Sequence, residues 1–338
     1  MSRPSSGLRW WLPLLGLPLL LCAAAAFFAW KWVDRPLPLA APTVELSVES
    51  GTRPREVGQA WVDAGVMTSP DFLYAWFRWS GQARRIRAGS YEVETGITPR
   101  RLLAKMVQGD EALEQVRFIE GWTLRQLRVA LAQAPHLKPT TAAMSEAQLM
   151  AALGAPGVPG EGRFFPDTYR YSRGVSDLTV LKRAYRSMQL RLEQTWAQRA
   201  PETPLKNADE ALTLASIVEK ETGTAADRGL VASVFTNRLR IGMPLQTDPT
   251  VIYGLGERFD GNLRKRDLLA DTPYNTYTRG GLPPTPISLP GLASLRAAVR
   301  PETSKALYFV ARGDGSSVFS ENLADHNRAV NKYQRGHP

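Results

Sequence analysis

The sequence predicts an α+β protein that follows a single membrane-spanning segment. Three observations favour this class. An uncharged apolar run stands near the N-terminus, strand-like segments alternate with amphipathic helices after it, and capped helices then lead into a long stretch rich in Pro and Gly. The 338 residues are enough for two ordinary domains, and a hydrophobic content of 43% is enough to fill their cores.

The apolar run WWLPLLGLPLLLCAAAAFFAW covers residues 10–30 and has the length that spans a bilayer core. Tryptophans at both of its ends are typical of the membrane interface. A cleaved signal peptide is the alternative, because the run ends in small residues, but no convincing cleavage site follows. Arg3 and Arg9 before the run give a slight charge asymmetry that favours a cytoplasmic N-terminus. We therefore expect a cytoplasmic tail over 1–9 and a transmembrane anchor over 10–32 in the inner membrane, with the rest of the chain periplasmic.

A Pro-rich linker over 33–42 is expected after the anchor. The segment TVELSVESG then alternates apolar and polar residues as a strand does, and residues 52–66 have a helical pattern. Residues 86–110 predict a further strand and a helix opened by Thr98 and Pro99. A related strand–glycine–helix pattern returns at 115–134, which indicates either a weakly repeated βα unit or chance similarity.

Longer helices follow in the second half of the chain. One is expected from about 177 to 199, and another begins at Asn207, whose relation to Glu210 is that of a capping box, and ends at Gly223. Residues 242–291 are dense in Pro and Gly. Loops of this length are usually functional or disordered, and the tyrosines within it argue against disorder. A hairpin over 306–320 and a last helix are expected to close the chain.

Composition excludes several classes of function. The single cysteine, Cys22, rules out an intramolecular disulfide and a cysteine–zinc cluster, and three scattered histidines do not suggest a metal site. We expect neither a metal nor a cofactor. A net charge of +10 raises the possibility of nucleic-acid binding. The basic residues are spread along the chain, however, and an anionic membrane surface or an acidic polymer explains them equally well, so no nucleic-acid partner is expected.

The segment LTLASIVEKETG carries the most suggestive chemistry. On a helical wheel a broad apolar face is buried, Lys220 points to solvent, and Glu219 and Glu221 lie on opposite edges of that face. Partial burial raises the pKa of a carboxyl group, which a general acid requires. Because the two side chains diverge, they cannot together flank one glycosidic bond. One of them could be catalytic while the other is structural. The alternative is that both are ordinary exposed surface residues without a functional role.

Two loops and an upstream motif offer further polar and aromatic side chains. Amides, hydroxyls and aromatic faces on stiff loops suit a polyhydroxylated ligand, although a packed irregular loop would contain the same residue types. The candidate binding residues are Glu161, Glu221, Gln246, Asp248, Tyr274, Asn275 and Tyr277.

These motifs resemble those of the endolytic peptidoglycan (murein) transglycosylase family, also called YceG-like. The resemblance is carried by LTLASIVEKETG, VASVFTNRLRIGMPLQTDPTVIYGLG, YNTYTRGGLPPTPISLPG, YFVARGDGSSVFSENLADHNRAV and EGRFFPDTY, and it covers about residues 8–335. It implies one transmembrane helix, a LysM-like subdomain over 43–135 and an α+β catalytic domain over 136–338. It also implies that Glu219, the first glutamate of EKET, is the catalytic acid. The family usually has a histidine where this chain has Ser317.

The resemblance implies cleavage of the β-1,4 bond between N-acetylmuramic acid and N-acetylglucosamine in nascent strands. The product would end in a 1,6-anhydro sugar, and cleavage would terminate glycan elongation. Expected partners are glycan strands and peptidoglycan synthases or division proteins. Two alternatives remain: a muramidase that uses water, and a non-catalytic, membrane-anchored peptidoglycan-binding or division scaffold. His326 is expected to be a core or helix-capping residue rather than a catalyst.

Overall fold

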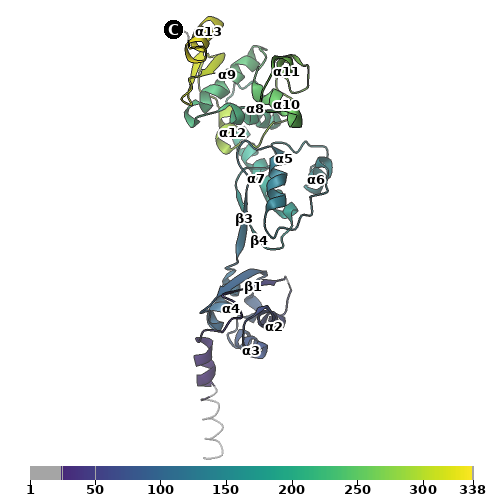
Figure 1. Ribbon diagram of the computed structural model, residues 1–338, viewed down its shortest axis with the longest axis vertical. Coiled ribbons are helices and arrows are strands. Elements are labelled where there is room, and N and C mark those ends of the chain that lie inside the picture. The colour runs from purple at the N-terminus through teal and green to yellow at the C-terminus, as the bar shows by residue number, and fades with distance from the viewer. Residues whose placement is uncertain (1–23, 25, 50, 337–338) are drawn as a thin grey trace, which may run out of the picture. The chain divides into compact units, whose positions relative to one another are not determined.

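The computed structural model describes residues 24, 26–49 and 51–336, which form two compact units divided after Glu114. Helices and short two-stranded sheets make up both units, so the α+β class is confirmed (Figure 1). The division falls within strand β3 (Leu113–Arg117), and the expected domain boundary at residue 135 lies inside the second unit. The reason is packing, since Val116, Leu127 and Leu131 belong to a core of the second unit.

The first unit has the element order βααβ followed by a helix. Its elements are β1 (Thr43–Val48), α2 (Pro54–Ala64), α3 (Pro70–Trp79), the short 3₁₀ helix η1 (Ala83–Arg85), β2 (Gly89–Glu94) and α4 (Pro99–Gln108). Strands β1 and β2 pair antiparallel, with Thr43 opposite Glu94 and Val48 opposite Gly89. The predicted start of α4 is confirmed, because the Thr98 side chain accepts a hydrogen bond from the Arg101 N–H and Pro99 stands in the first turn.

Much of the segment expected to be a Pro-rich linker is packed against this unit. Val33 and Leu37 are 2% and 5% exposed, and Leu39 forms a β-bridge with Val66. Backbone hydrogen bonds join the Leu37 N–H to the Ile97 carbonyl at 2.8 Å and the Met67 N–H to the Pro38 carbonyl at 2.9 Å. Residues 33–40 therefore belong to the folded unit, because their apolar side chains complete its core.

Most of the expected anchor over 10–32 lies outside the described residues, as does Cys22. Residues 26–33, at the end of that segment, are helical. In the part of the chain that the structure describes, none of the helices combines the length and the apolar character needed to cross a bilayer.

The second unit contains the remaining helices and two further sheets. Its elements after β3 are α5 (Leu124–Gln133), α6 (Glu146–Ala152), β4 (Thr168–Ser172), α7 (Asp177–Ala197), α8 (Ala208–Glu221), η2 (Ala225–Asp227), α9 (Arg228–Arg240), α10 (Asp248–Leu255), η3 (Gly256–Arg258), α11 (Lys265–Leu269), α12 (Leu292–Val299), β5 (Tyr308–Ala311), β6 (Ser317–Ser320) and α13 (Leu323–Tyr333). Strand β3 pairs with β4, and β5 and β6 form the expected antiparallel hairpin.

Helix α8 is the centre of this unit. All residues from Ala211 to Val218 are buried, including the polar Ser216, because α7, α9, α10 and α12 surround the helix. The predicted N-cap is confirmed, since the Asn207 side chain accepts a hydrogen bond from the Glu210 N–H at 2.9 Å. The helix ends at Glu221 with Thr222 as its C-cap, and not at Gly223. Gly223 does not adopt a left-handed conformation, and its small size instead admits the Gly315 carbonyl, which would lie 3.0 Å from an added Cβ.

The Pro- and Gly-rich segment 242–291 is folded, as its tyrosines predicted. It contains α10, η3 and α11, and its end is fastened to the middle of α8. The Ile287 N–H donates to the Ser216 hydroxyl at 3.0 Å, and the Ser288 hydroxyl donates to the Ser216 carbonyl at 3.1 Å. These buried bonds fix the position of Gly291 relative to the last turn of α8.

Candidate active site

The carboxylate of Glu219 is held at the end of α8 by groups from two other helices. Its side chain is 8% exposed. The Gly291 N–H, just before α12, donates to Oε2 at 2.9 Å, and Arg228 Nη2, at the start of α9, lies 4.0 Å from Oε1. These two contacts fix the orientation of the Glu219 carboxylate at the end of α8.

A second carboxylate, that of Glu120, lies against the same glycine. A Cβ added to Gly291 would come within 1.8 Å of Glu120 Oε1, so only a glycine leaves room for this contact. Partial burial raises the pKa of Glu120, the charge of Glu219 raises it further, and the Arg228 guanidinium opposes both effects. Glu120, Glu219 and Arg228 therefore form one electrostatically coupled cluster around Gly291.

The loop between β3 and α5 carries Glu120 to this position. Gly121 has a left-handed φ of +78°, and its N–H donates to the Leu289 carbonyl at 2.8 Å. The Leu289 N–H donates back to the Trp122 carbonyl at 2.6 Å. These two backbone hydrogen bonds tie the loop to the segment that leads into Gly291. Glu120 and Glu219 therefore reach this glycine from different elements.

Sequence reasoning missed Glu120 and Arg228. Glu120 stands in the repeated strand–glycine–helix pattern, which indicated only a βα turn, and Arg228 stands among surface-like charges. Their relevance depends on contacts between segments far apart in the chain. The one available signal was the Glu–Gly pair ahead of the Thr123 helix cap, in which the glycine allows a sharp turn and the glutamate is left beside it.

Glu221 faces a different set of residues, as the helical wheel predicted. It accepts a hydrogen bond from the Thr247 hydroxyl. Burial raises the pKa of Glu221, the Thr247 hydrogen bond opposes this, and the charge of Asp248 raises it further. The Tyr277 hydroxyl donates to Asp248 Oδ1 at 2.6 Å, and burial, that hydrogen bond and the nearby charges raise the pKa of Tyr277. The structure thus brings Glu221, Asp248 and Tyr277 together beside α8.

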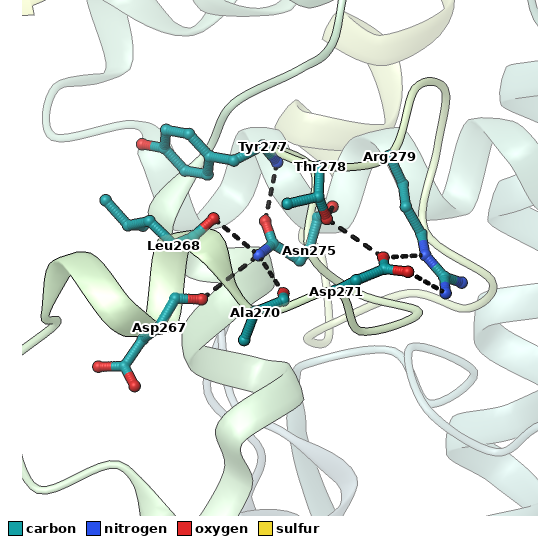
Figure 2. A network of polar contacts seen from close by, with 8 residues as sticks. All are labelled: Asp267, Leu268, Ala270, Asp271, Asn275, Tyr277, Thr278 and Arg279. Carbon is teal, nitrogen blue, oxygen red and sulfur yellow. Dashed lines mark hydrogen bonds and ion pairs between the residues drawn. The ribbon is translucent and has the colours of Figure 1, made fainter.

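Asn275 holds the loop that carries Tyr277. Its side chain is fully buried, and Nδ2 donates to the backbone carbonyls of Leu268 at 3.0 Å and Ala270 at 2.6 Å (Figure 2). Its Oδ1 accepts from the Tyr277 N–H at 2.9 Å. Figure 2 also shows the ion pair between Asp271 and Arg279, 2.6 Å long, beside this clamp. The amide of Asn275 is fully engaged, which favours a positioning role over a direct contact with a ligand.

Gln246 and Tyr274 are placed differently from one another. Gln246 is exposed and has a left-handed φ of +49°, held by its N–H bond to the Thr276 carbonyl at 3.0 Å. Tyr274 is half-buried, packs edge-to-face on Tyr253 with ring centres 4.9 Å apart, and hydrogen-bonds Thr285 through its hydroxyl. Gln246 is therefore free to contact a ligand, whereas Tyr274 is built into the packing of the loop.

Glu161 is buried at the start of α5. It is 5% exposed, and its carboxylate accepts hydrogen bonds from the Leu124 N–H at 3.0 Å and from the Tyr253 hydroxyl at 3.2 Å. Burial raises the pKa of Glu161 to about 7 although these hydrogen bonds oppose the shift. Such a group caps a helix and joins it to α10, so the geometry favours a structural role for Glu161.

Ser317, where the family resemblance implies a histidine, is the first residue of β6 in the hairpin β5–β6. The Ser317 N–H donates to Asp227 Oδ2 at 2.7 Å, which fastens the hairpin turn beside the end of α8. His326 stacks on Tyr308 with ring centres 5.1 Å apart and is part of the packing between α13 and the hairpin. Among the described residues, no three His, Cys, Asp or Glu side chains are grouped so that they could hold a metal ion.

The arrangement can perform acid–base chemistry with a carboxyl group. Glu219 is nearly buried, is oriented by one N–H and one guanidinium, and lies beside a second acidic side chain. The fold and the site define an α+β protein with a nearly buried carboxylate, that of Glu219, beside a second one at the end of a central helix.

Comparison with known proteins places the chain within a family. The profile of the YceG-like family matches residues 46–332, and the chain belongs to that family. An endolytic murein transglycosylase of Bacillus subtilis is 31% identical in an alignment 308 residues long, which covers 86% of this chain and 85% of the relative. A Streptococcus pneumoniae protein of the same name is 27% identical, with 92% of this chain matching 63% of its length. The crystal structure of a YceG-like protein from Listeria monocytogenes has a TM-score of 0.55 and 28% identity, covering 85% of this chain and 98% of that one.

Proposed function

We propose that this protein is an endolytic murein transglycosylase with Glu219 as its catalytic acid. The observation that carries the proposal is the carboxylate of Glu219, nearly buried and held by the Gly291 N–H beside Arg228 and Glu120. Membership of the YceG-like family and the names of the relatives in Bacillus subtilis and Streptococcus pneumoniae support the activity.

The mechanism needs one group that first gives and then takes a proton. Glu219 protonates the glycosidic oxygen between N-acetylmuramic acid and N-acetylglucosamine as the bond from that oxygen to C1 breaks. The carboxylate that remains accepts the proton of the muramyl C6 hydroxyl, whose oxygen closes on C1 and forms the 1,6-anhydro ring. Arg228 and the Gly291 N–H stabilise the carboxylate between the two steps.

Glu120 adds a negative charge where the sugar becomes positively charged. An ionised Glu120 beside Glu219 would stabilise the oxocarbenium-like transition state. A muramidase that hydrolyses the bond with water needs a second carboxylate as well, and Glu120 is the residue that could supply it. The chemical nature of the new sugar end therefore distinguishes the two reactions.

The neighbouring loops are the proposed sugar-binding surface. Asp248 and Tyr277 form a polar pair beside Glu221, and Gln246 is exposed on the turn before Asp248. In this proposal these residues contact or orient the glycan, Tyr274 supports the loop, and Asn275 and Glu161 hold the framework.

The proposed location is outside the cytoplasm, with residues 10–32 as an inner-membrane anchor. The charge-free run in the sequence and the extracytoplasmic position of peptidoglycan support this. The βααβ order of the first unit supports a LysM-like, glycan-binding module. Nascent strands, and hence peptidoglycan synthases or division proteins that make or organise them, are the proposed partners.

Mass spectrometry of fragments released from purified peptidoglycan tests the reaction. The full-length chain in detergent should release fragments that end in the anhydro sugar, lighter by one water than hydrolysed ends. Hydrolysed reducing ends would instead establish a muramidase. Binding without release would favour the non-catalytic scaffold.

A further inference from the structure

Helix α3 of the first unit exposes large aromatic side chains. Leu73 and Phe77 are fully buried in the core, yet Phe72 and Trp79 on the same helix are 60% and 64% exposed. A surface helix ordinarily turns polar residues outward, opposite its core face. Helix α3 is therefore apolar on two faces, only one of which the fold of the first unit covers.

The uncovered face of α3 continues onto the helical residues 26–33. Trp32 packs edge-to-face on Phe72 with ring centres 5.8 Å apart. Between the two segments is a hollow of about 460 Å³ with an almost wholly apolar lining, formed by Phe28, Ala29, Trp32, Val33, Phe72, Ala75, Trp76 and Trp79. Phe27, Phe28 and Trp30 are a further 54%, 68% and 53% exposed. Apolar exposure of this kind marks an interaction surface.

Among the residues that the structure describes near this surface, cations outnumber the acidic groups left to pair with them. Asp34 is paired with Arg100 at 2.7 Å, and Asp71 is paired with Arg55 at 3.2 Å. Lys31, Arg35 and Arg78 are exposed next to the aromatic residues in the chain, and Lys31 Nζ lies 5.9 Å from the centre of the Phe27 ring. Aromatic rings bordered by Lys and Arg are typical of segments that lie in the headgroup region of an anionic bilayer.

We propose that helix α3 and residues 26–33 together form a lipid-contacting surface, with the hollow between them filled by lipid at the outer boundary of the membrane. The inference rests on the proposed anchor. Lipid is the occupant because the segment 26–33, which supplies one wall of the hollow, contains the end of the apolar run 10–30.

The short connection to the rest of the unit strengthens this argument. Val33 and Leu37 are buried in the unit, and the Leu37 N–H is bonded to the Ile97 carbonyl. No slack chain is therefore left between the helical segment and the folded unit that carries α3. Insertion of the apolar run brings α3 to the same bilayer surface, and the first unit is held against the membrane rather than swinging on a tether.

The test places a fluorescent reporter on α3 of the full-length chain. In a Cys22→Ser background, Trp79→Cys and separately Phe72→Cys are labelled with a polarity-sensitive dye. The protein is then reconstituted into vesicles of phosphatidylethanolamine and phosphatidylglycerol. A Ser47→Cys variant on β1, also exposed and in the same unit, is the control. Alkaline-resistant flotation with the vesicles is measured first, because it reports whether the anchor inserts.

Labels at 72 and 79 should emit at shorter wavelength than the label at 47. Lipids with a quencher near the headgroup should quench them at least about threefold more strongly, as expected for aromatic positions in the interface. Equal quenching at all three positions in protein that floats would overturn the lipid-contact surface while leaving the anchor intact. A blue-shifted but unquenched label would show that protein, such as a second copy, covers the hollow, and would also overturn it. Failure to float would refute the anchor, and the surface proposal with it.

Discussion

Two glutamates in one turn of α8 receive different surroundings from the fold. Glu219 meets the Gly291 N–H and Arg228, whereas Glu221 meets the Thr247 hydroxyl and the charge of Asp248. The difference follows from helical geometry, since residues two apart point to opposite sides. It supports Glu219 as the residue beside the bond to be cleaved and Glu221 as part of the adjoining polar cluster.

Glu120 should contribute to turnover through its charge. Glu120→Gln keeps the size of the side chain but removes the negative charge next to Glu219, so kcat should fall by roughly 10²-fold, as for loss of one electrostatic stabiliser. The pKa of Glu120 is raised, so the ionised form is lost as the pH falls toward mildly acidic values. Wild-type kcat should accordingly decline on that acidic side, and the variant should lack this contribution.

A matched variant controls for a general effect of lost charge. Glu257→Gln removes an 81% exposed carboxylate that pairs with Arg125 on the surface. Its pH–rate profile and kcat should match those of the wild type. The role assigned to Glu120 would be wrong if Glu120→Gln behaved like Glu257→Gln.

Asn275 should matter to stability more than to chemistry. Asn275→Ala removes the donor for the Leu268 and Ala270 carbonyls and the acceptor for the Tyr277 N–H, all in a buried place. Leaving such groups without partners costs about 2–3 kcal/mol. Urea unfolding should show that loss. A variant as stable as the wild type would mean that water replaces the amide.

At the scale of elements, Gly291 before α12 is the point where the two carboxylates meet. Its φ of −76° is open to any residue, so the constraint is space and not backbone conformation. Gly291→Ala would place a Cβ against the Glu120 carboxylate and displace it. We expect kcat to fall about as far as in Glu120→Ala, with the fold retained.

A double-mutant cycle measured by kcat tests this contact. Once Glu120→Ala has removed the carboxylate, Gly291→Ala should cause little further loss, since interacting residues are not additive. Two fully additive losses would contradict the proposed contact and indicate that Gly291→Ala disturbs Glu219 directly.

The free energy of unfolding should depend measurably on pH because of Glu161, whose carboxylate caps the start of α5. Burial raises the pKa of Glu161 to about 7 in the folded protein, above its value of 4.5 in the unfolded chain. The folded state therefore binds the proton more tightly, and stability falls as the pH rises from about 4.5 to about 7. The free energy of unfolding attributable to Glu161 should drop by an amount on the order of 3 kcal/mol over this window.

Glu161→Gln should remove that slope, because glutamine does not titrate. The measurement is urea unfolding at pH 5 and pH 7.5, with the difference between wild type and variant taken at each pH so that other titrating groups cancel. An identical slope in both proteins would show that Glu161 stays ionised in the fold.

Over the whole molecule, the sequence correctly predicted those features that depend on interactions between residues close together in the chain. Helix caps at Thr98 and Asn207, the β5–β6 hairpin and the divergence of Glu219 from Glu221 depend on residues near one another in the chain, and the structure has them as predicted. Composition also indicated correctly that residues 242–291 fold, since their tyrosines need burial.

Long-range packing decided what the sequence did not predict. Residues 33–40 look like a Pro-rich tether, but their leucines fill the first unit. Glu120 reaches the site because the β3–α5 loop is bonded to the segment before α12, more than a hundred residues away. Polar residues such as Asn275 and Glu161 have the composition of a binding loop, yet their hydrogen bonds are used up inside the protein.

The most direct test of the central claim compares Glu219→Gln with Glu221→Gln in release of soluble fragments from peptidoglycan. The two substituted side chains are both uncharged, are equal in size and lie in the same helical turn. Glu219→Gln should reduce release by roughly 10²- to 10⁴-fold, as loss of a general acid–base group does, while unfolding in urea as the wild type does. Glu221→Gln changes the proposed sugar-binding cluster and not the proton transfer, so it should lose far less activity than Glu219→Gln. Release at the wild-type rate by folded Glu219→Gln, or a larger loss in Glu221→Gln, would contradict the account.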